Sequence, residues 1–368
     1  MDIYSAVNNK ELKGLRQSRK SDHLHHTLQL PDGPGNAGFA DVTLIHNCLP
    51  DIAWSGIALD TSLAGIALTN PVIINAITGG AVDVTEINSS LAQVAKLTGA
   101  AMAVGSQYSA LENDAVWESY QIVRRVNPEG IIIANLGAHA SSEQARIAID
   151  MIGADALQIH LNAAQEIIMA EGDRDFFGYL DNIARIASEV NVPVIVKEVG
   201  CGIAREAAAR LASTGVQAID VGGRGGTNFV AIEAARSQTQ LPEEMLQWGI
   251  PTVVSALEAV SVLPASVQLI VSGGIRSPLD MIKSMAFGAS AVAIAAPVLR
   301  IVCQQGVAAA VDWLQNFLHT GKRYMMLVGA KDIKDLQTVP FLIGGSSREW
   351  LETRKIDITH YANRKKHG

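Results

Sequence analysis

The sequence predicts a single (β/α)8 barrel of the TIM-barrel class, an α/β fold, with an N-terminal extension and a long loop after the sixth strand. From residue 71 onward, eight short apolar runs alternate with amphipathic stretches, and the 368 residues include 32 glycines for tight turns. Apolar strands alternating with helices are typical of a parallel sheet covered on both faces. Eight such units favour closure into a barrel, and an open doubly wound sheet is the alternative.

Each element has an expected range. The strands are expected at Pro71–Ala76, Ala101–Gly105, Gly130–Leu136, Ala156–Leu161, Pro193–Glu198, Ala218–Gly222, Val267–Ser272 and Ala291–Ala295. The helices are expected at Glu86–Leu97, Ala115–Val126, Ser142–Ile152, Tyr179–Val190, Arg205–Ser213 and Pro278–Phe287. The chain thus divides into an arm with short pre-barrel strands (1–70), the barrel (71–340) and a C-terminal tail (341–368). The polar segment 224–249 is expected to form a loop or lid over the C-terminal face of the barrel.

Composition limits the function class and the compartment. Hydrophobic residues make up 48% of the chain, and the net charge of −7 argues against a nucleic-acid-binding protein. The three cysteines, at 48, 201 and 303, form no C-x-x-C pair, which favours a reducing, cytoplasmic compartment. Residues 1–10 have no apolar core, and the apolar stretch 289–302 is interrupted by Pro297 and Arg300. We therefore expect neither a signal peptide nor a membrane span.

Polar residues follow six consecutive predicted strands. Ligands of such barrels gather at the strand ends. The strand-end residues are Ala76-Ile77-Thr78-Gly79-Gly80, Gly105-Ser106-Gln107, Asn135, His160-Leu161-Asn162, Lys197-Glu198 and Gly222-Gly223-Arg224-Gly225-Gly226-Thr227. Taken singly, each has an ordinary explanation, since glycine marks turns, asparagine caps helices and a lone histidine is often a satisfied polar residue. Six in succession indicate a binding site.

The last two units predict a phosphate site. Ser272-Gly273-Gly274-Ile275-Arg276-Ser277 follows the seventh strand, and the eighth ends in Ala295-Ala296-Pro297 where a helix begins. Glycines let the backbone approach an anion, and the N–H groups of a helix start point at it. The loops after strands 7 and 8 are the usual phosphate-binding place in this fold. Thr227 can add a hydroxyl.

Lys197 directly follows the apolar run 194–196, so it is expected at the carboxyl end of the fifth strand, at the barrel mouth. Two interpretations stay open for it: an ion pair with another barrel carboxylate, or a cation beneath a flavin ring that stabilises negative charge on the reduced ring. Glu198 is expected on the opposite side of the strand, because successive side chains alternate.

The segment 160–166 is expected to place three polar side chains on one face of a helix. If a helix starts after the fourth strand, Asn162, Gln165 and Glu166 lie at i, i+3 and i+4. A carboxamide and a carboxylate aimed at one cavity suit a substrate bound through Mg²⁺ and diphosphate, because magnesium typically takes one or two protein carboxylates plus phosphate oxygens and water. The alternative is a capped helix with polar first-turn residues.

These motifs together resemble type 2 isopentenyl-diphosphate isomerase, the FMN-dependent family, over nearly the whole chain. The matching motifs are Arg19-Lys20-x-x-His23, Ile77-Thr78-Gly79-Gly80, Gly105-Ser106-Gln107, Ala134-Asn135-Leu136-Gly137, His160-Leu161-Asn162-x-x-Gln165-Glu166, Lys197-Glu198-Val199-Gly200, Gly225-Gly226-Thr227-Asn228 and Ser272-Gly273-Gly274-Ile275-Arg276. One departure is Tyr108, which stands where the family pattern has arginine. His23, His25 and His26 have no cysteine or acidic partner at ligand spacing, so zinc is not expected.

The resemblance implies interconversion of isopentenyl and dimethylallyl diphosphate in isoprenoid biosynthesis. It implies reduced FMN for acid/base proton transfer, NADPH as reductant, Mg²⁺ and a homo-oligomer, tetramer or octamer. By resemblance, Gln165 and His160 are catalytic and Glu166 binds the metal. The implied substrate-binding residues are Arg19, Lys20, Ser106, Gln107, Asn162 and Gln165. The implied FMN-binding residues are Ala76, Ile77, Thr78, Ser106, Asn135, Lys197, Gly222, Thr227, Gly273, Gly274, Arg276, Ala295 and Ala296.

Two other functions are alternatives to the isomerase. Another FMN barrel enzyme is one: a 2-hydroxy-acid oxidase needs a base histidine around strands 6–7, and an inosine-monophosphate-dehydrogenase-like enzyme needs a cysteine after strand 6. No histidine lies between His160 and His319, and no cysteine lies between Cys201 and Cys303. The other is a flavin-binding module without catalysis, which is expected to lack Gln165 and Glu166.

Overall fold

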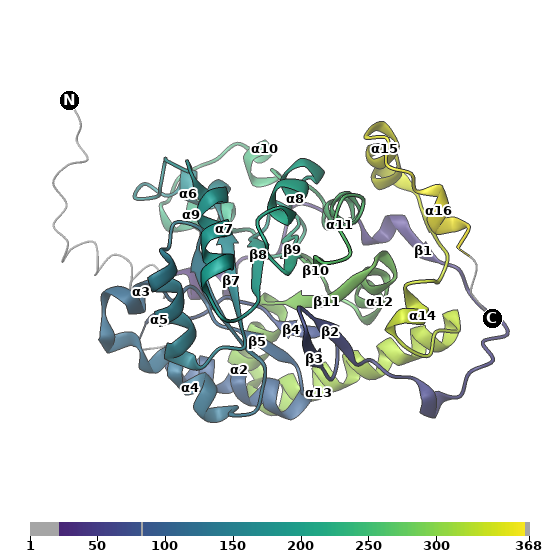
Figure 1. Cartoon of the computed structure of the whole chain (residues 1–368), viewed down its shortest axis with the longest axis horizontal. Coiled ribbons are helices and arrows are strands. Elements are labelled where there is room, and N and C mark those ends of the chain that lie inside the picture. The colour runs from purple at the N-terminus through teal and green to yellow at the C-terminus, as the bar shows by residue number, and fades with distance from the viewer. Residues whose placement is uncertain (1–21, 82–83, 365–368) are drawn as a thin grey trace.

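Eight parallel strands form a closed barrel in the computed structural model, which describes residues 22–81 and 84–364 (Figure 1). The strands are β4 (Val72–Ile74), β5 (Ala101–Ala103), β6 (Ile132–Gly137), β7 (Ala156–Leu161), β8 (Val194–Glu198), β9 (Ala218–Asp220), β10 (Gln268–Ser272) and β11 (Ala289–Ile294). Closure occurs because β10 pairs with both β9 and β11, and β11 pairs with β4. The predicted (β/α)8 fold is therefore confirmed, and the open sheet is excluded.

The helices predicted between the strands are present. They are α2 (Thr85–Thr98), α4 (Glu118–Val126), α5 (Ser142–Ile152), α7 (Tyr179–Glu189), α8 (Arg205–Ala212) and α12 (Pro278–Phe287). Capping boxes define where α5 and α12 begin: Ser141 pairs with Gln144, and Ser277 pairs with Asp280. Each box satisfies backbone N–H groups that a helix start leaves unpaired.

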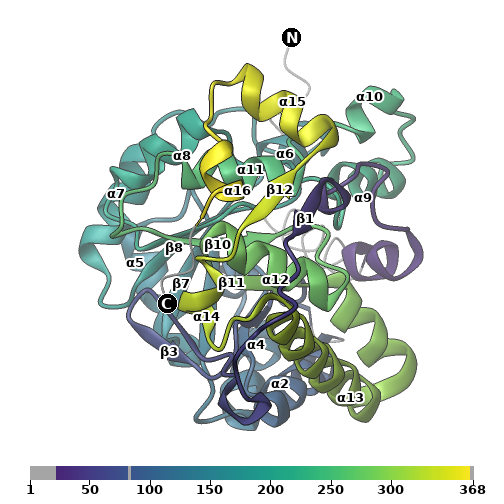
Figure 2. The ribbon, with the colours of Figure 1, turned by 90° about the vertical axis from the view of Figure 1, so that its right-hand side faces the viewer.

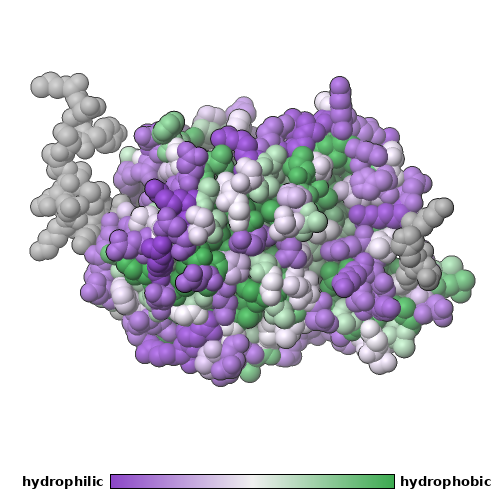
Figure 3. Space-filling model, viewed as in Figure 1, coloured by the Kyte–Doolittle hydropathy of each residue, from purple (hydrophilic) through white to green (hydrophobic). Residues whose placement is uncertain are grey.

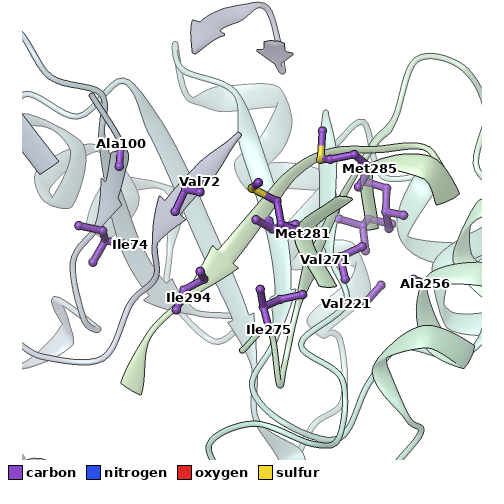
Figure 4. Close-up of a cluster of buried hydrophobic side chains, with 14 of the residues drawn as sticks. Val72, Ile74, Ala100, Val221, Ala256, Val271, Ile275, Met281, Met285 and Ile294 are labelled. Carbon is purple, nitrogen blue, oxygen red and sulfur yellow. The ribbon is translucent and has the colours of Figure 1, made fainter. Parts of the chain in front are cut away.

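The core has two parts because strand side chains alternate. Val72 and Ile74 of β4 point outward and share a cluster with Met281 and Met285 of α12 (Figure 4). Ile73, between them, points inward to the second cluster, which fills the barrel. This packed interior makes the barrel a rigid platform for the residues at its strand ends.

A strand before the barrel and a strand after it meet in a small sheet beside the barrel (Figure 2). The strand β1 (Val42–Leu44) pairs antiparallel with β12 (Phe341–Ile343). The segment expected as a C-terminal tail thus contains β12 and the helices α15 (Gly345–Thr353) and α16 (Thr359–Ala362). Buried Glu258, in α11 (Thr252–Val260), anchors this region by accepting hydrogen bonds from Trp350 Nε1 (2.9 Å) and Arg354 Nε (2.8 Å).

The connection after β9 is long, as expected, but it is not only a loop. It contains α9 (Phe229–Arg236) and α10 (Glu243–Leu246). The side chain of Asn228 caps α9 by accepting from Ala231 N at 3.1 Å, a start signal hidden in a polar segment. α9 packs against α6 (Ala163–Ile168), the helix that follows β7.

The longest helix, α13 (Ala296–Val328), follows β11 and is interrupted at Gly306, where φ is 85°. Within residues 22–81 and 84–364, no helix combines the length and apolarity needed to cross a membrane. On the face seen in Figure 3, hydrophilic side chains predominate and hydrophobic ones form smaller patches between them.

Candidate active site

The carboxyl ends of the strands border two adjoining cavities. The larger has a volume of about 170 Å³ and the smaller about 50 Å³. Both are lined by Ala76, Ile77, Lys197, Val199 and Phe229, so the cavities meet there. The site is therefore divided into two compartments with one shared wall.

Glycines shape the smaller cavity. Gly273 and Gly274 have φ values of 98° and 78°, and a Cβ at Gly273 would lie 2.0 Å from the carbonyl oxygen of Gly223. Only glycine fits there, and it leaves the backbone exposed to a ligand. The same cavity includes Ala295, Ala296 and the start of α13. Such a backbone cradle at a helix start suits a phosphate group.

Arg276 and Lys197 are cationic side chains that line this cavity, and Arg276 follows the Gly273-Gly274 loop. Its guanidinium forms an ion pair with Asp32, which also binds Arg300 at 3.2 Å. Burial lowers the pKa of Arg276, although Asp32 acts in the opposite direction. Gly33, next to Asp32, donates its N–H to Gly226 O at 3.2 Å. The segment before β1 therefore covers the glycine loops, a contact that the sequence analysis did not predict.

Lys197 lies at the wall between the cavities. The strand register places His160, Lys197 and Asp220 side by side on β7, β8 and β9. Lys197 Nζ donates to Glu198 O at 2.9 Å and lies 3.9 Å from Asp220 Oδ2. Both interpretations of Lys197 are thus compatible with the structure, since it pairs with a barrel carboxylate and also lines both cavities.

Glu198 turns away from both cavities. Its Oε2 accepts the backbone N–H groups of Gly200, Cys201 and Gly202 at 2.6, 2.5 and 3.1 Å. Burial raises the pKa of Glu198 to about 7, against the effect of these hydrogen bonds. Lys197 is consequently the residue of this pair that lines the cavities.

The larger cavity carries a histidine beside an amide. His160 Nδ1 lies 2.9 Å from Asn135 Oδ1, and both residues line the cavity with Ser106. Tyr108 also lines it and contacts His139 edge-on, with ring centroids 4.7 Å apart. An aromatic pair thus stands where the family pattern would place an arginine.

The predicted cluster on α6 is present. Asn162 Nδ2 donates to Gln165 Oε1 at 3.2 Å and to Glu166 Oε1 at 2.7 Å, and all three residues line the larger cavity. Asn162 occupies the N-cap position, yet its side chain makes no hydrogen bond to the backbone of the helix. Among the residues that the structure describes, no ion pair involves the Glu166 carboxylate, whereas the guanidinium of Arg174 donates to the Glu166 backbone carbonyl at 2.6 Å. The cluster is therefore directed at the cavity and does not merely cap the helix.

Glu233 of α9 is the main site residue that sequence reasoning missed. Its buried carboxylate accepts hydrogen bonds from His23 Nε2, Gln165 Nε2 and Arg236 Nε, each at 2.7 Å. Burial alone would raise the pKa of Glu233, but these partners outweigh it and lower the pKa to about 2. The i,i+3 spacing of Glu233 and Arg236 is the one sequence signal that could have drawn attention to it.

Most predicted site residues lie on these cavities. The larger is lined by Ala76, Ile77, Ser106, Asn135, His160, Asn162, Gln165, Glu166 and Lys197, and the smaller by Ala76, Ile77, Lys197, Gly222, Thr227, Gly273, Gly274, Arg276, Ala295 and Ala296. Two predicted site residues, Thr78 and Gln107, line neither cavity. Thr78 donates its hydroxyl to Asn88 at 2.5 Å. Buried Gln107 donates to Ala148 O at 2.8 Å and accepts from Asn135 N at 3.0 Å. Arg19 and Lys20 lie outside the described residues.

Replacing Glu233 by Gln is expected to remove stability in a defined pH range. The lowered pKa stabilises the fold above about pH 4.5, and this contribution is lost as the pH falls toward 2. A shift from 4.5 to about 2 corresponds to about 3 kcal/mol at neutral pH. Denaturant unfolding at several pH values should therefore show Glu233→Gln less stable than wild type at pH 7, with the gap closing toward pH 2. A pH-independent gap would contradict the assignment, and exposed Glu243→Gln is the matched control.

Known proteins resemble this chain over most of its length. The FMN-dependent dehydrogenase family matches residues 133–340. An isopentenyl-diphosphate delta-isomerase of Symbiobacterium thermophilum is 47% identical over 359 residues, covering 95% of this chain and 99% of the relative. The protein of the same name from a Geobacillus species is 47% identical over 350 residues, with coverage of 95% and 99%.

Solved structures support the fold. A lactate oxidase of Pediococcus acidilactici superposes with a TM-score of 0.67 at 19% identity, covering 94% of this chain and 96% of that one. A mandelate oxidase gives a TM-score of 0.65 at 17% identity, with coverage of 90% and 99%. At this identity the likeness concerns the barrel alone. With near-full-length relatives at 47% identity, the resemblance seen in the motifs is confirmed, and the chain belongs to the isopentenyl-diphosphate delta-isomerase family that carries an FMN-dependent dehydrogenase domain.

Proposed function

We propose that the protein interconverts isopentenyl and dimethylallyl diphosphate, using FMN, Mg²⁺ and NADPH, as a cytoplasmic homo-oligomer. The observation that carries this proposal is the pair of cavities meeting at Lys197. The smaller has glycine loops and cationic side chains, which suit an anion, and the larger presents a neutral carboxamide, Gln165, beside a carboxylate, Glu166.

The residues of the smaller cavity fit the phosphate of FMN. Gly273 and Gly274 leave their backbone accessible, and Arg276 adds a positive charge. Lys197, on the wall toward the larger cavity, is placed to balance negative charge on a bound ring. When bound, reduced FMN supplies the acid/base chemistry of this redox-neutral double-bond shift.

The residues of the larger cavity fit an allylic diphosphate with Mg²⁺. Glu166 offers the hard oxygen ligand that magnesium prefers. The remaining ligands of the metal would include phosphate oxygens of the substrate. Gln165 lines the cavity and is held by Asn162 and Glu233. We propose that its carboxamide contacts the hydrocarbon part of the substrate. We propose that Arg19, Lys20 and His160 bind the diphosphate and that His160 assists catalysis. Tyr108, through its contact with His139, then replaces an arginine contact with an aromatic wall.

The main competing function is oxidation of a 2-hydroxy acid, which the structural neighbours suggest by their names. The base histidine needed for that reaction is missing from residues 161–318 of this sequence. The residues after β7 instead supply Gln165 and Glu166 to the cavity. The isomerase is therefore the function that the site supports best.

The protein is expected to bind FMN more tightly than riboflavin, because the glycine loops after β9 and β10 and the start of α13 are assigned to the phosphate. Loss of several hydrogen bonds to a charged group, each contributing about 1.5–3 kcal/mol, predicts at least a tenfold weaker riboflavin complex. Fluorescence titration of the apoprotein measures both affinities. Equal affinities would remove the phosphate site from this cavity.

The proposed function is tested by incubating the purified protein with isopentenyl diphosphate, FMN, Mg²⁺ and NADPH, and then omitting each cofactor in turn. Dimethylallyl diphosphate should form in the complete mixture and fall to background in each omission. Oxidation of lactate or mandelate under the same conditions, with no isomerisation, would favour the competing function.

A further inference from the structure

A continuous chain of buried side chains runs across the barrel toward His160. It starts at Asp220 of β9, passes Asn75 at the end of β4 and Gln158 of β7, and reaches Asn135 of β6. The donor–acceptor distances are 3.0 Å from Asn75 Nδ2 to Asp220 Oδ2, 3.2 Å from Gln158 Nε2 to Asn75 Oδ1, and 3.1 Å from Asn135 Nδ2 to Gln158 Oε1. These four side chains are at most 4% exposed, so their mutual contacts replace water.

The donor-to-acceptor direction of these hydrogen bonds is fixed at the Asp220 end. Asn75 Oδ1 also accepts the backbone N–H of Ala76 at 2.9 Å, and a backbone N–H can only donate. Asn75 must therefore turn its NH₂ group to Asp220, whose carboxylate accepts. Ser272 Oγ donates to the other oxygen of Asp220 at 2.5 Å, which holds this carboxylate in place.

The fixed direction passes from one amide to the next. Because Asn75 presents its oxygen, Gln158 must present its NH₂ group to it and its oxygen to Asn135. Asn135 then presents its NH₂ group to Gln158 and its Oδ1 to His160 Nδ1, at 2.9 Å. An amide oxygen is only an acceptor, so His160 Nδ1 must carry a proton.

We propose that Asp220, Asn75 and Gln158 are positioning residues that hold the neutral ring of His160 as its Nδ1–H tautomer. The lone pair of that ring is then at Nε2. His160 consequently accepts a hydrogen bond at Nε2 when neutral and donates one there only as the imidazolium. This arrangement sets which proton the ring can offer at the cavity that Asn135 and His160 both line.

The test uses the full-length protein with FMN, labelled with ¹⁵N at histidine. The two ring nitrogens of His160 are assigned with His160→Gln and observed by NMR at a pH where the ring is neutral. Wild type is expected to show a protonated Nδ1 and an unprotonated Nε2. The variant Gln158→Met keeps the side-chain length but interrupts the series of hydrogen bonds. The ¹⁵N chemical shifts of the two ring nitrogens should then move toward averaged values, because both tautomers become populated.

Asn70→Leu is the matched control. Asn70 is equally buried at the start of β4, and its side chain bonds Thr98 O (3.1 Å) and Val72 N (3.1 Å), away from His160. The control should keep the wild-type pattern. An Nε2–H tautomer in wild type, an unchanged tautomer in Gln158→Met, or an equal change in both variants would each overturn the proposal. The wild-type spectrum decides even if Gln158→Met does not fold.

A kinetic measurement adds a second readout that rests on the proposed isomerisation. Loss of one oriented hydrogen bond predicts about a fivefold higher KM for isopentenyl diphosphate in Gln158→Met, and no change in Asn70→Leu. An unchanged KM would separate the tautomer from substrate binding and contradict this part. Absence of turnover in wild type would contradict the proposed function, whereas the tautomer is measured without substrate.

Discussion

Gln165→Ala is expected to lower kcat about 100-fold while leaving FMN content and the Mg²⁺ requirement close to wild type. The carboxamide is fixed from two sides, by Asn162 at 3.2 Å and by Glu233 at 2.7 Å. It carries no charge, so it contributes by orienting the allylic group or relaying its proton in the transition state. Positioned proton-transfer groups contribute about 10²–10⁴-fold to rate. The loss should therefore affect kcat and kcat/KM together.

The control for Gln165→Ala is Gln144→Ala. Gln144 is also an amide in the first turn of a helix, but its Oε1 accepts the N–H of Ser141 in the capping box of α5, and it lines neither cavity. This variant should melt at a lower temperature and keep its kcat. If Gln165→Ala behaves in the same way, with lowered stability and unchanged kinetics, Gln165 is structural and the catalytic assignment is wrong.

Glu166→Gln is expected to raise the Mg²⁺ concentration for half-maximal activity by at least about tenfold. Even residues that only support a metal ligand contribute about 10–100-fold to affinity, and Glu166 is proposed as the direct ligand. The substitution keeps the shape of the side chain and its contact with Asn162, so FMN binding should not change. Activity titrated with Mg²⁺ at fixed substrate gives the half-maximal concentration.

Asp173→Asn controls for the loss of negative charge at the same cavity. Asp173 lines the cavity near Glu166, and its backbone N–H, which the substitution keeps, donates to Glu166 Oε2 at 2.9 Å. If the half-maximal Mg²⁺ concentration changes little in Asp173→Asn and rises strongly in Glu166→Gln, Glu166 is supported as a specific metal ligand. Equal shifts in the two variants would instead indicate a general effect of cavity charge, and Glu166 would lose its assignment.

The barrel could be predicted from the sequence because its signals are local. β7 (Ala156–Leu161), α5 and α12 have the predicted bounds, since apolar runs and capping residues mark them directly. The helix α9 was not predicted because polar residues elsewhere in the segment 224–249 hide its short apolar run, although six of the eight residues of α9 are apolar. Its stability also depends on the Asn228 cap and on packing against α6. The structure in residues 341–362 was hidden for a similar reason, because β12 forms only by pairing with the distant β1.

The candidate site was predicted less completely, because several of its contacts join distant residues. Glu233 meets Gln165 across 68 positions of the sequence, and no spacing rule connects them. Gln107 belongs to a matching motif, yet its carboxamide is bonded to Ala148 and Asn135 inside the wall. A motif thus identifies a strand end, while the direction of each side chain depends on the partners that the fold supplies.

The central claim is that the two cavities meeting at Lys197 carry out an isomerisation that needs reduced flavin but does not consume it. The direct test is anaerobic: FMN bound to the protein is photoreduced without NADPH, and isopentenyl diphosphate and Mg²⁺ are added. Product is followed by NMR and the flavin by its absorbance. We expect many turnovers to dimethylallyl diphosphate with the flavin still reduced, and no turnover once air reoxidises it. Equal turnover with oxidised flavin, or one flavin oxidised for each product formed, would contradict the account.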